Sequence, residues 1–550
     1  MGEKCRTLRA SACGRFGDLR GATSAMAAGK LLVRALLIAV ATIVGQQSLA
    51  VDLSYGAAGD FIVGNRQVSV SRTAGGSGSF NALVYYPATS AGTNTPLDPS
   101  GGAYPVVSFA HGYTTVTANS LPASLAQLAS HGYIVIAPQS YESVLDVLQT
   151  EALGHDQTSA YNYLTTQNSK ASSIFYQHVQ TTGYAAMGHS MGGAASISEA
   201  SQNAAVKTVV TWAAQNMNIP VQAPDQIADV HVPVQLIAGT NDTTVSASTT
   251  NSIYNNGNPA IELNNLVGAT HLGFYDTGPA WQLNYARALS VQWLDLYMKG
   301  DQSVWRDLWG PEAGADALVQ NSLTSGINVN GPIKTLTGSE GTTVAYSLTV
   351  KNNGDVPTSY SLFVEDNLYG TSLSTLQTPV VAVGQKASFQ VFVDLPNDAP
   401  LDALDNVLVS ARNDLDGGTR DFVVLTTLVS QRAPGDANND GVTNGLDYVA
   451  WSDHFGQSTT QGHNDGDFNT DGVVDGLDYT MWADNFSAAS AALPGGADGL
   501  MLLAVPEPEG LALACGGLFA IAVLSCVFVR PKGLRSMSDA RPRASTGRAD

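Results

Sequence analysis

The stretch GYAAMGHSMGGAAS, residues 183–196, decides the fold of the region around it. An apolar run ends in GHSMGG, residues 188–193, and small residues then continue at helical spacing. This pattern predicts a strand, a sharp turn and a helix, with Ser190 on the turn at the C-terminal edge of a sheet. A Gly-x-Ser-x-Gly sequence arises easily in a chain with 55 glycines, so its meaning depends on the residues around it.

Short apolar runs and helical spacings alternate on both sides of this turn. Several of the runs are continuously apolar, as expected of strands that helices cover on both faces of a mostly parallel sheet. The alternation predicts an α/β sandwich with a mostly parallel sheet, which we place at residues 51–310, with a closing helix at residues 281–301. The predicted strands are 81–87, 105–112, 133–139, 183–188, 206–213, 232–239 and 260–269. The other predicted helices are 121–132, 155–167 and 191–202.

Asp242 and His271, which come much later in the sequence, complete the catalytic triad that we predict with Ser190. A serine hydroxyl is a weak nucleophile unless a histidine takes its proton and a carboxylate orients that histidine. In this fold the partners follow in the order Ser, Asp, His. Asp242 follows the predicted strand at 232–239, and His271 follows the one at 260–269. We therefore predict Ser190 as the nucleophile, His271 as the base and Asp242 as the orienting acid.

Acyl transfer also needs N–H donors where negative charge develops on the carbonyl oxygen. One donor is expected from the backbone of Met191, the residue directly after the nucleophile. The second is expected from the loop after the strand at 105–112, with the N–H of Tyr113 as the best candidate. His111 lies on that same loop, so we do not expect it to act as the catalytic base.

The stretches HGYTTVTANSLPASLAQLASHGYIVIAPQ, GHSMGG, TWAAQN and GATHLGF together resemble the bacterial cutinase and polyester hydrolase (PET hydrolase-like) branch of the α/β-hydrolases. The resemblance covers about residues 55–300 and implies ester hydrolysis through an acyl-enzyme intermediate. It also implies that Tyr113, Met191 and Trp212 line the substrate subsite, although the sequence equally allows Trp212 in the core. His111 stands where the polyester-cleaving members usually carry proline, and no cysteine is present for the disulfide that the family often has.

The sequence pattern changes after the α/β region. Period-two alternation, broken by Asn-Gly and Asp-Gly turns, predicts an all-β immunoglobulin-like sandwich at residues 327–432. The sequence of this segment contains no recognisable grouping of catalytic or metal-binding residue types. We therefore expect it to act as a spacer or accessory domain.

A second chemistry lies in a repeated motif. GDANNDGVTNGLDYVAW, residues 435–451, recurs as GDFNTDGVVDGLDYTMW, residues 466–482. Oxygen-bearing side chains at loop positions 1, 3, 5, 9 and 12, with glycine at position 6, match an EF-hand-like calcium loop. Asp at position 12, followed by Tyr, resembles a type I dockerin at residues 434–487, which implies a small α-helical domain and a possible cohesin partner. The predicted Ca²⁺ ligands of the two sites are Asp436, Asn438, Asp440, Asn444, Asp447, Asp467, Asn469, Asp471, Asp475 and Asp478.

Both ends of the chain combine apolar runs with basic residues. LLVRALLIAVATIVG followed by QQSLA predicts a signal peptide at residues 1–50, with Met26 as an alternative start. VPEPEGLALACGGLFAIAVLSCVFVRPKGLR has the length and basic flank of a transmembrane segment. It resembles a PEP-CTERM sorting signal at residues 505–535, which implies processing by an exosortase-type enzyme. All the cysteines lie in these terminal segments, so the part between them has no disulfide and no thiolate metal site.

These features predict an exported serine ester hydrolase at the cell surface, in the envelope or outside the cell. A formal charge of −20 makes a nucleic-acid partner unfavourable. Catalysis is expected to need no cofactor, and Ca²⁺ is expected only in the repeated motif. Two alternatives stay open: an esterase for acetylated polysaccharide or lipid, and a catalytically inactive hydrolase fold that serves as a surface binding protein.

Overall fold

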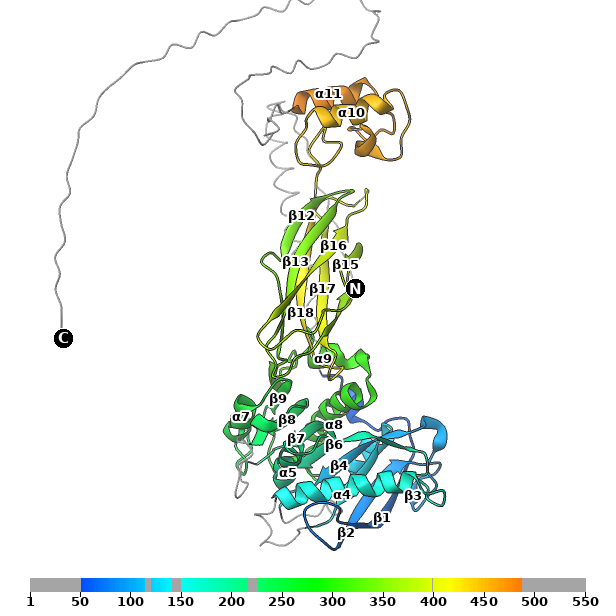
Figure 1. The fold of residues 1–550 in the computed structure, drawn as a ribbon, viewed down its shortest axis with the longest axis vertical. Helices are drawn as coiled ribbons and strands as arrows, with labels where there is room; N and C mark the ends of the chain where they lie inside the picture. Colours follow the sequence, from blue (N-terminus) through cyan, green and yellow to red (C-terminus); the bar gives the residue numbers. More distant parts are fainter. Residues whose placement is uncertain (1–50, 114–119, 141–149, 216–225, 398, 487–550) are drawn as a thin grey trace, which may run out of the picture. The chain divides into compact units, whose positions relative to one another are not determined.

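The computed structural model describes residues 51–113, 120–140, 150–215, 226–397 and 399–486 (Figure 1). The predicted signal peptide and sorting signal lie outside these ranges. Within them, no helix is both long enough and apolar enough to cross a bilayer.

The strands of the α/β region form one sheet of ten: β1 (Val63–Ser71), β2 (Ser79–Pro87), β3 (Gly92–Thr93), β4 (Tyr104–Ala110), β5 (Ile134–Pro138), β6 (Val179–His189), β7 (Val206–Trp212), β8 (Val234–Gly239), β9 (Ile261–Leu266) and β10 (Val319–Thr324). Their order is β10-β9-β8-β7-β6-β4-β5-β2-β1-β3. Neighbours from β9 to β5 are parallel, whereas β10 and β2 join antiparallel at the two sides. The C-terminal ends of the parallel strands therefore meet at one edge, where ligands bind in such sheets.

Helices cover both faces of this sheet: α3 (Pro122–Ser130), α4 (Thr150–Asn168), α5 (Met191–Ala200), α7 (Ala247–Asn256) and α8 (Ala280–Leu294). α3 and α8 share a core with Phe109 and Met187. α4, α5 and α7 share a second core with Val106 and Ala186. Successive residues of β4 and β6 thus enter different cores. Burial on both faces explains why these strands are continuous apolar runs in the sequence.

The structure adds elements that the apolar pattern did not predict. β1 is only partly buried and α7 is largely polar, so both carry a weak apolar signal. β10 lies between the predicted α/β region and the predicted all-β segment, where we expected no element, yet it pairs antiparallel with β9. The sheet therefore extends past the predicted boundary at residue 310. The predicted closing helix at residues 281–301 is α8 followed by a π-helical turn, Asp295–Lys299, and α9 (Trp305–Leu308) comes after it.

Two four-stranded sheets follow: β11 (Ile327–Asn330), β12 (Thr335–Ser339), β13 (Thr343–Asn352), β14 (Tyr360–Glu365), β15 (Gly370–Leu373), β16 (Lys386–Asp394), β17 (Leu404–Asn413) and β18 (Arg420–Ser430). Their orders are β11-β13-β16-β15 and β12-β18-β17-β14. Tyr346, Leu348 and Val350 of β13 are buried while the residues between them are more exposed, which is the period-two pattern of the sequence. Side chains from both sheets form one core.

Two short helices end the described part of the chain: α10 (Gly445–His454) and α11 (Gly476–Asn485). The indole N–H of Trp451 donates to the backbone oxygen of Asp475 at 2.8 Å. Reciprocally, the indole N–H of Trp482 donates to the backbone oxygen of Asn444, also at 2.8 Å. Each helix thus contacts the loop of the other repeat, so the repeats form one small domain.

A buried arginine joins the α/β region to the two sheets. The Cζ atom of Arg420 lies 4.6 Å from the ring centre of Trp305 and 4.4 Å from that of Phe363. Its Nη2 donates to Oε1 of Gln302 at 2.9 Å, and its Nη1 lies 3.4 Å from Oε1 of Glu365. Burial lowers the pKa of Arg420 to about 10. The stacking and the polar partners together offset the cost of this burial.

A buried carboxyl group lies where β8, β9 and β10 meet. Oε2 of Glu262 accepts an N–H from Gln235 at 2.8 Å, and Oε1 accepts one from Asn321 at 3.0 Å. Glu262 is only 1% exposed, and burial outweighs these hydrogen bonds and raises its pKa to about 7. The folded chain therefore holds a proton on Glu262 at a pH where the unfolded chain has lost it.

We expect Glu262→Gln to make the protein more stable at pH ~8 but not at pH ~4. The ordinary pKa of Glu262 is 4.5, so both states are protonated below that value and burial there costs no charge. Between pH 4.5 and about 7 the folded protein loses up to about 3 kcal/mol of stability, at about 1.4 kcal/mol per pKa unit, and the loss is complete above that range. Thermal unfolding at the two pH values checks this, with the exposed Glu151→Gln as control. Equal shifts at both pH values would contradict it.

Candidate active site

Ser190 occupies the turn between β6 and α5. Its backbone has φ of +55° and ψ of −114°, which non-glycine residues rarely adopt. Two glycines give this turn its room: a Cβ atom on Gly188 would lie 2.3 Å from the oxygen of Gly192, and one on Gly192 would lie 2.1 Å from the oxygen of Ala110. The strained turn holds Ser190 at the C-terminal edge of the sheet, where the sequence predicts it.

The three residues of the predicted triad lie together at this edge. Nε2 of His271 is 3.0 Å from Oγ of Ser190, and Nδ1 of His271 is 2.7 Å from Oδ2 of Asp242. The other oxygen of Asp242, Oδ1, accepts the backbone N–H groups of Thr244 and Val245 at 2.8 and 2.7 Å. The carboxylate is thereby fixed, and it orients the imidazole toward the serine. All three triad side chains are nearly buried.

The predicted oxyanion donors also lie close to the serine. Met191 is the first residue of α5, and the N–H groups of a first helical turn have no acceptor within the helix. Tyr113 follows β4, and its side chain packs against the cluster that Met191 forms with Ala110 and Leu153. The backbones of residues 113 and 191 therefore come from neighbouring elements at the same edge of the sheet.

The position of Trp212 corrects one expectation from the resemblance. Its side chain is completely buried, and its indole N–H donates to Oγ of Ser290 in α8 at 3.0 Å. It packs edge-on against Phe109 and stacks on Phe274. Trp212 is therefore a core residue, the alternative that the sequence left open, because β7 directs it to the face that α8 covers. Met191 is buried as well, so its side chain is part of the packing around the turn.

His189 is a site residue that sequence reasoning missed. It precedes Ser190, is completely buried, and its Nε2 donates to the backbone oxygen of His271 at 3.2 Å. Its ring centre lies 4.7 Å from that of His271 and 4.9 Å from that of Tyr275. Burial, and then the neighbouring imidazole, lower the pKa of His189 to about 3. In the sequence, only the position of His189 next to Ser190 pointed to it. That position does not tell whether His189 packs in the core or supports His271.

We expect a single proton to govern the acid side of the pH–rate profile. Because burial keeps His189 neutral down to about pH 3, its ring adds no second proton to the loss of rate as the pH falls toward ~5. The value of kcat/KM should therefore drop about tenfold per pH unit on that side. A hundredfold drop per unit would mean that His189 gains a proton in the same range, contrary to this prediction. Initial rates on a soluble ester across this pH range provide the measurement.

The two repeated loops have the same internal geometry. The carboxylate of Asp436 accepts the N–H groups of Asp440 and Gly441, and Asp467 does the same for Asp471 and Gly472 at closely similar distances. Gly441 and Gly472 have φ of +83° and +88°, which the sharp turn at loop position 6 requires. The spacing that the sequence predicts therefore forms two equivalent loops.

The oxygen-bearing side chains of these loops are of the kind that binds a hard cation. Asp436, Asp447 and Asp478 are fully buried, and the hydrogen bonds they accept come from backbone N–H groups. A cation would neutralise this buried charge. Within the described ranges, however, no three His, Cys, Asp or Glu side chains converge closely enough to hold a metal ion. The amide oxygens of Asn438 and Asn469, which belong to the predicted ligand set, are not counted in such a grouping.

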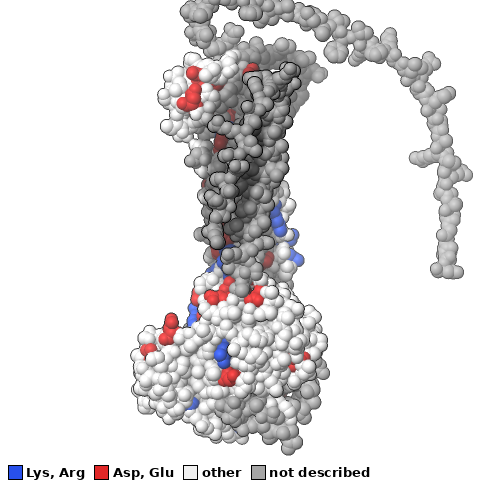
Figure 2. All heavy atoms as spheres, turned by 180° about the vertical axis from the view of Figure 1, so that it is seen from behind, with Lys and Arg blue, Asp and Glu red and all other residues white. Residues whose placement is uncertain are grey.

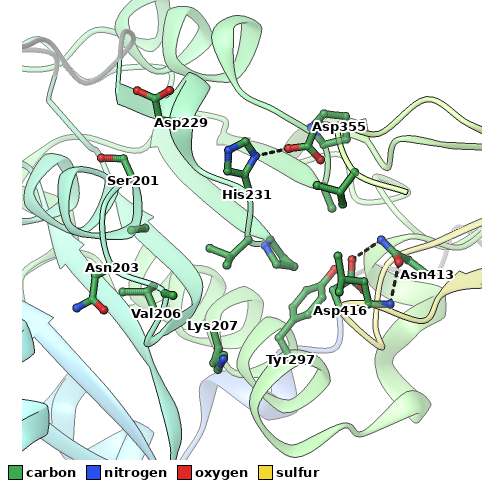
Figure 3. A pocket seen from close by; sticks show the side chains of 18 of the residues that line it. Ser201, Asn203, Val206, Lys207, Asp229, His231, Tyr297, Asp355, Asn413 and Asp416 are labelled. Atoms are coloured by element: carbon green, nitrogen blue, oxygen red, sulfur yellow. Dashed lines mark hydrogen bonds and ion pairs between the residues drawn. The ribbon is translucent and has the colours of Figure 1, made fainter. Parts of the chain in front are cut away.

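A separate cavity of about 710 Å³ lies at the far end of α5 (Figure 3). Its lining includes Ser201 and Asn203 after α5, Lys207 at the start of β7, and His231 paired with Asp355. α5 begins beside Ser190 and ends at Ala200, so its length of about 15 Å separates the cavity from the triad. The cavity is not part of the candidate active site.

The visible surface carries few charged groups. Figure 2 shows one face of the molecule on which acidic and basic side chains form separate spots on a mostly uncharged surface. No continuous basic patch is seen among the described residues on that face. Together with the net charge of −20, this argues against binding to a polyanion there.

Comparison with known proteins finds two families. Residues 50–322 match the PET hydrolase-like family, and residues 434–486 match the dockerin type I domain. Cutinase est1 of Thermobifida alba is 27% identical over 247 residues, which cover 44% of this chain and 73% of the relative. Cutinase 1 of Thermobifida cellulosilytica and the cutinase of Thermobifida fusca are each 26% identical over 249 residues, 44% of this chain and 82% or 71% of the relative. The chain thus has a cutinase-like α/β-hydrolase fold, then a β-rich region and a dockerin.

Proposed function

We propose that the chain is an exported serine carboxylic-ester hydrolase that acts through Ser190, His271 and Asp242. The single observation that carries this proposal is the hydrogen-bonded chain of the three side chains, 3.0 Å from serine to histidine and 2.7 Å from histidine to aspartate. The serine stands on a strained turn whose two glycines have no room for a Cβ. The likeness to cutinases supports the ester as substrate class.

The geometry gives each residue one role in the reaction. Oγ of Ser190 attacks the ester carbonyl while Nε2 of His271 takes the serine proton, and Asp242 stabilises the imidazolium that forms. The backbone N–H groups of Tyr113 and Met191 hold the oxyanion of the tetrahedral intermediate. His271 then protonates the leaving alcohol. Water repeats the sequence on the acyl-enzyme, which releases the acid and restores Ser190.

Hydrolysis of p-nitrophenyl esters from acetate to decanoate by the purified protein tests the proposal. Turnover of the wild type that the Ser190→Ala chain lacks supports a serine esterase, and the preferred acyl length identifies its type. Preference for acetate would favour an acetyl-polysaccharide esterase, whereas preference for longer chains would favour a cutinase-like or lipid esterase. Equal rates for wild type and variant on every ester would overturn the enzyme and favour the inactive surface binding protein.

In this proposal the remaining parts of the chain export the enzyme and attach it at its place of action. The dockerin binds two Ca²⁺ ions in its loops and attaches the enzyme to a cohesin. The β-rich region is an immunoglobulin-like sandwich between the enzyme and the dockerin. The signal peptide at residues 1–50 directs export, and the segment at residues 505–535 acts as a sorting signal for an exosortase-type enzyme. A dockerin implies an extracellular or surface location, which the hydrolysis of external esters requires.

A further inference from the structure

His111, a completely buried histidine, begins the loop after β4 that carries the proposed oxyanion donor Tyr113. Both ring nitrogens of His111 face backbone carbonyl oxygens: Nδ1 lies 2.8 Å from the oxygen of Gly112, and Nε2 lies 2.6 Å from the oxygen of Ser140. A carbonyl oxygen only accepts hydrogen bonds, and a neutral imidazole carries a proton on one nitrogen, so the tautomer decides which of the two oxygens receives the hydrogen bond. The ring therefore clamps its own loop, after β4, when Nδ1 carries that proton, and the loop after β5 when Nε2 does.

The bond to Gly112 fixes more than one carbonyl group. The peptide unit between Gly112 and Tyr113 is planar and trans, so its C=O and N–H point in opposite directions. When His111 holds the oxygen of Gly112, it thereby sets the direction of the Tyr113 N–H. That N–H is the oxyanion donor contributed by this loop in the proposed function.

The surroundings of the loop leave it little freedom on the other side. A Cβ atom on Gly112 would lie 2.9 Å from Nδ1 of His189, and one on Gly192 would lie 2.7 Å from the oxygen of His111. The loop is therefore pressed between α5 and the imidazole that supports the catalytic base. Gly112 has no side chain to hold the rotation of the 112–113 peptide, so a hydrogen bond to its carbonyl oxygen can set that rotation.

We propose that His111 is a positioning residue that aims the Tyr113 N–H at the oxyanion by donating from Nδ1 to the oxygen of Gly112. The inference rests on the proposed esterase function and adds a residue to it. His111 does not touch substrate and is not the base, because its two nitrogens are occupied by carbonyl oxygens and the base is His271. It acts through Tyr113 alone.

A pair of substitutions separates the two bonds. The amide nitrogen of asparagine lies near the place of Nδ1, so His111→Asn keeps the bond to Gly112 and loses the one to Ser140. The amide nitrogen of glutamine lies near the place of Nε2, so His111→Gln does the reverse. We expect His111→Gln to lower kcat about 10- to 100-fold with KM unchanged, and His111→Asn to stay within about threefold of wild type.

Three readouts on the full chain make the test specific. The first is kcat and KM on a p-nitrophenyl ester. The second is the affinity for an alkyl boronic acid, whose tetrahedral adduct mimics the oxyanion, and which we expect to fall in His111→Gln by the same factor as kcat. The third is the melting temperature, which should agree between the two variants within a few degrees. If His111→Gln does not fold, His111→Phe removes both ring nitrogens and takes its place against His111→Asn.

The outcomes distinguish this inference from the proposed function. Equal loss of kcat in both variants, loss confined to KM, or unchanged boronic acid affinity would overturn the positioning role while the esterase stands. A wild type without hydrolysis that depends on Ser190 would overturn the esterase, and the role of His111 with it. A loss of kcat and boronic acid affinity in His111→Gln alone supports the clamp.

Discussion

Replacement of Ser190 by alanine is expected to lower kcat on a soluble ester by about 10⁴- to 10⁶-fold. The oxygen that attacks is removed, and His271 and Asp242 then have no nucleophile to activate. Because the hydroxyl is not needed to hold the turn, the melting temperature should change little. Initial rates and thermal unfolding of both chains check the two parts of this prediction.

A matched control lies at the other end of the same helix. Ser201 follows α5, and its hydroxyl donates to a backbone oxygen of that helix, far from the triad. Ser201→Ala should keep wild-type kcat. If Ser190→Ala retained more than about a tenth of the wild-type rate, another residue would be the nucleophile and the proposed mechanism would be wrong.

Removal of Ca²⁺ is expected to unfold the dockerin and leave ester hydrolysis intact. Each loop buries carboxylates that a cation would neutralise, and a ligand at a thousand times its Kd stabilises by about 4 kcal/mol per site. Two such sites exceed the stability that a core of about 50 residues supplies alone. A chelator should therefore abolish the calorimetric transition of residues 434–486, while the rate on a p-nitrophenyl ester stays within about twofold.

Substitutions in the loops test the same prediction without a chelator. Asp436→Ala and Asp467→Ala each remove the predicted ligand at loop position 1 and should each lower the melting temperature of the dockerin in saturating Ca²⁺. Asp453→Asn, at an exposed position of α10, should leave it unchanged. A transition that neither chelator nor loop substitution moves would show that the repeats are stable without calcium.

Most of the candidate active site could be predicted from the sequence, because the chemistry and the fold constrain the same positions. Ser190 needs a glycine-flanked turn, and Asp242 and His271 must each follow a parallel strand to reach one edge of the sheet. Each of these features can be recognised from a short stretch of sequence around the residue. The two repeated loops were predicted for a similar reason, because a repeated motif keeps its oxygen-bearing side chains and glycines in register.

What the sequence did not reveal depends on contacts between distant segments. β10 is short and polar, and only its pairing with β9 makes it a strand. Trp212 follows the same apolar run whether it faces the core or a subsite, and burial beneath α8 decides between the two. Nothing in the sequence distinguishes His189 and His111 from the other residues of their motifs. Only the structure shows that their rings lie against backbone carbonyl oxygens.

The most direct measurement of the central claim is the site of covalent modification by a fluorophosphonate, read by mass spectrometry of the intact chain and its peptides. The account predicts one adduct per folded chain, located on Ser190, and its loss in His271→Ala and after denaturation, because only the activated serine reacts. An unmodified wild-type chain, or an adduct on another residue, would contradict it.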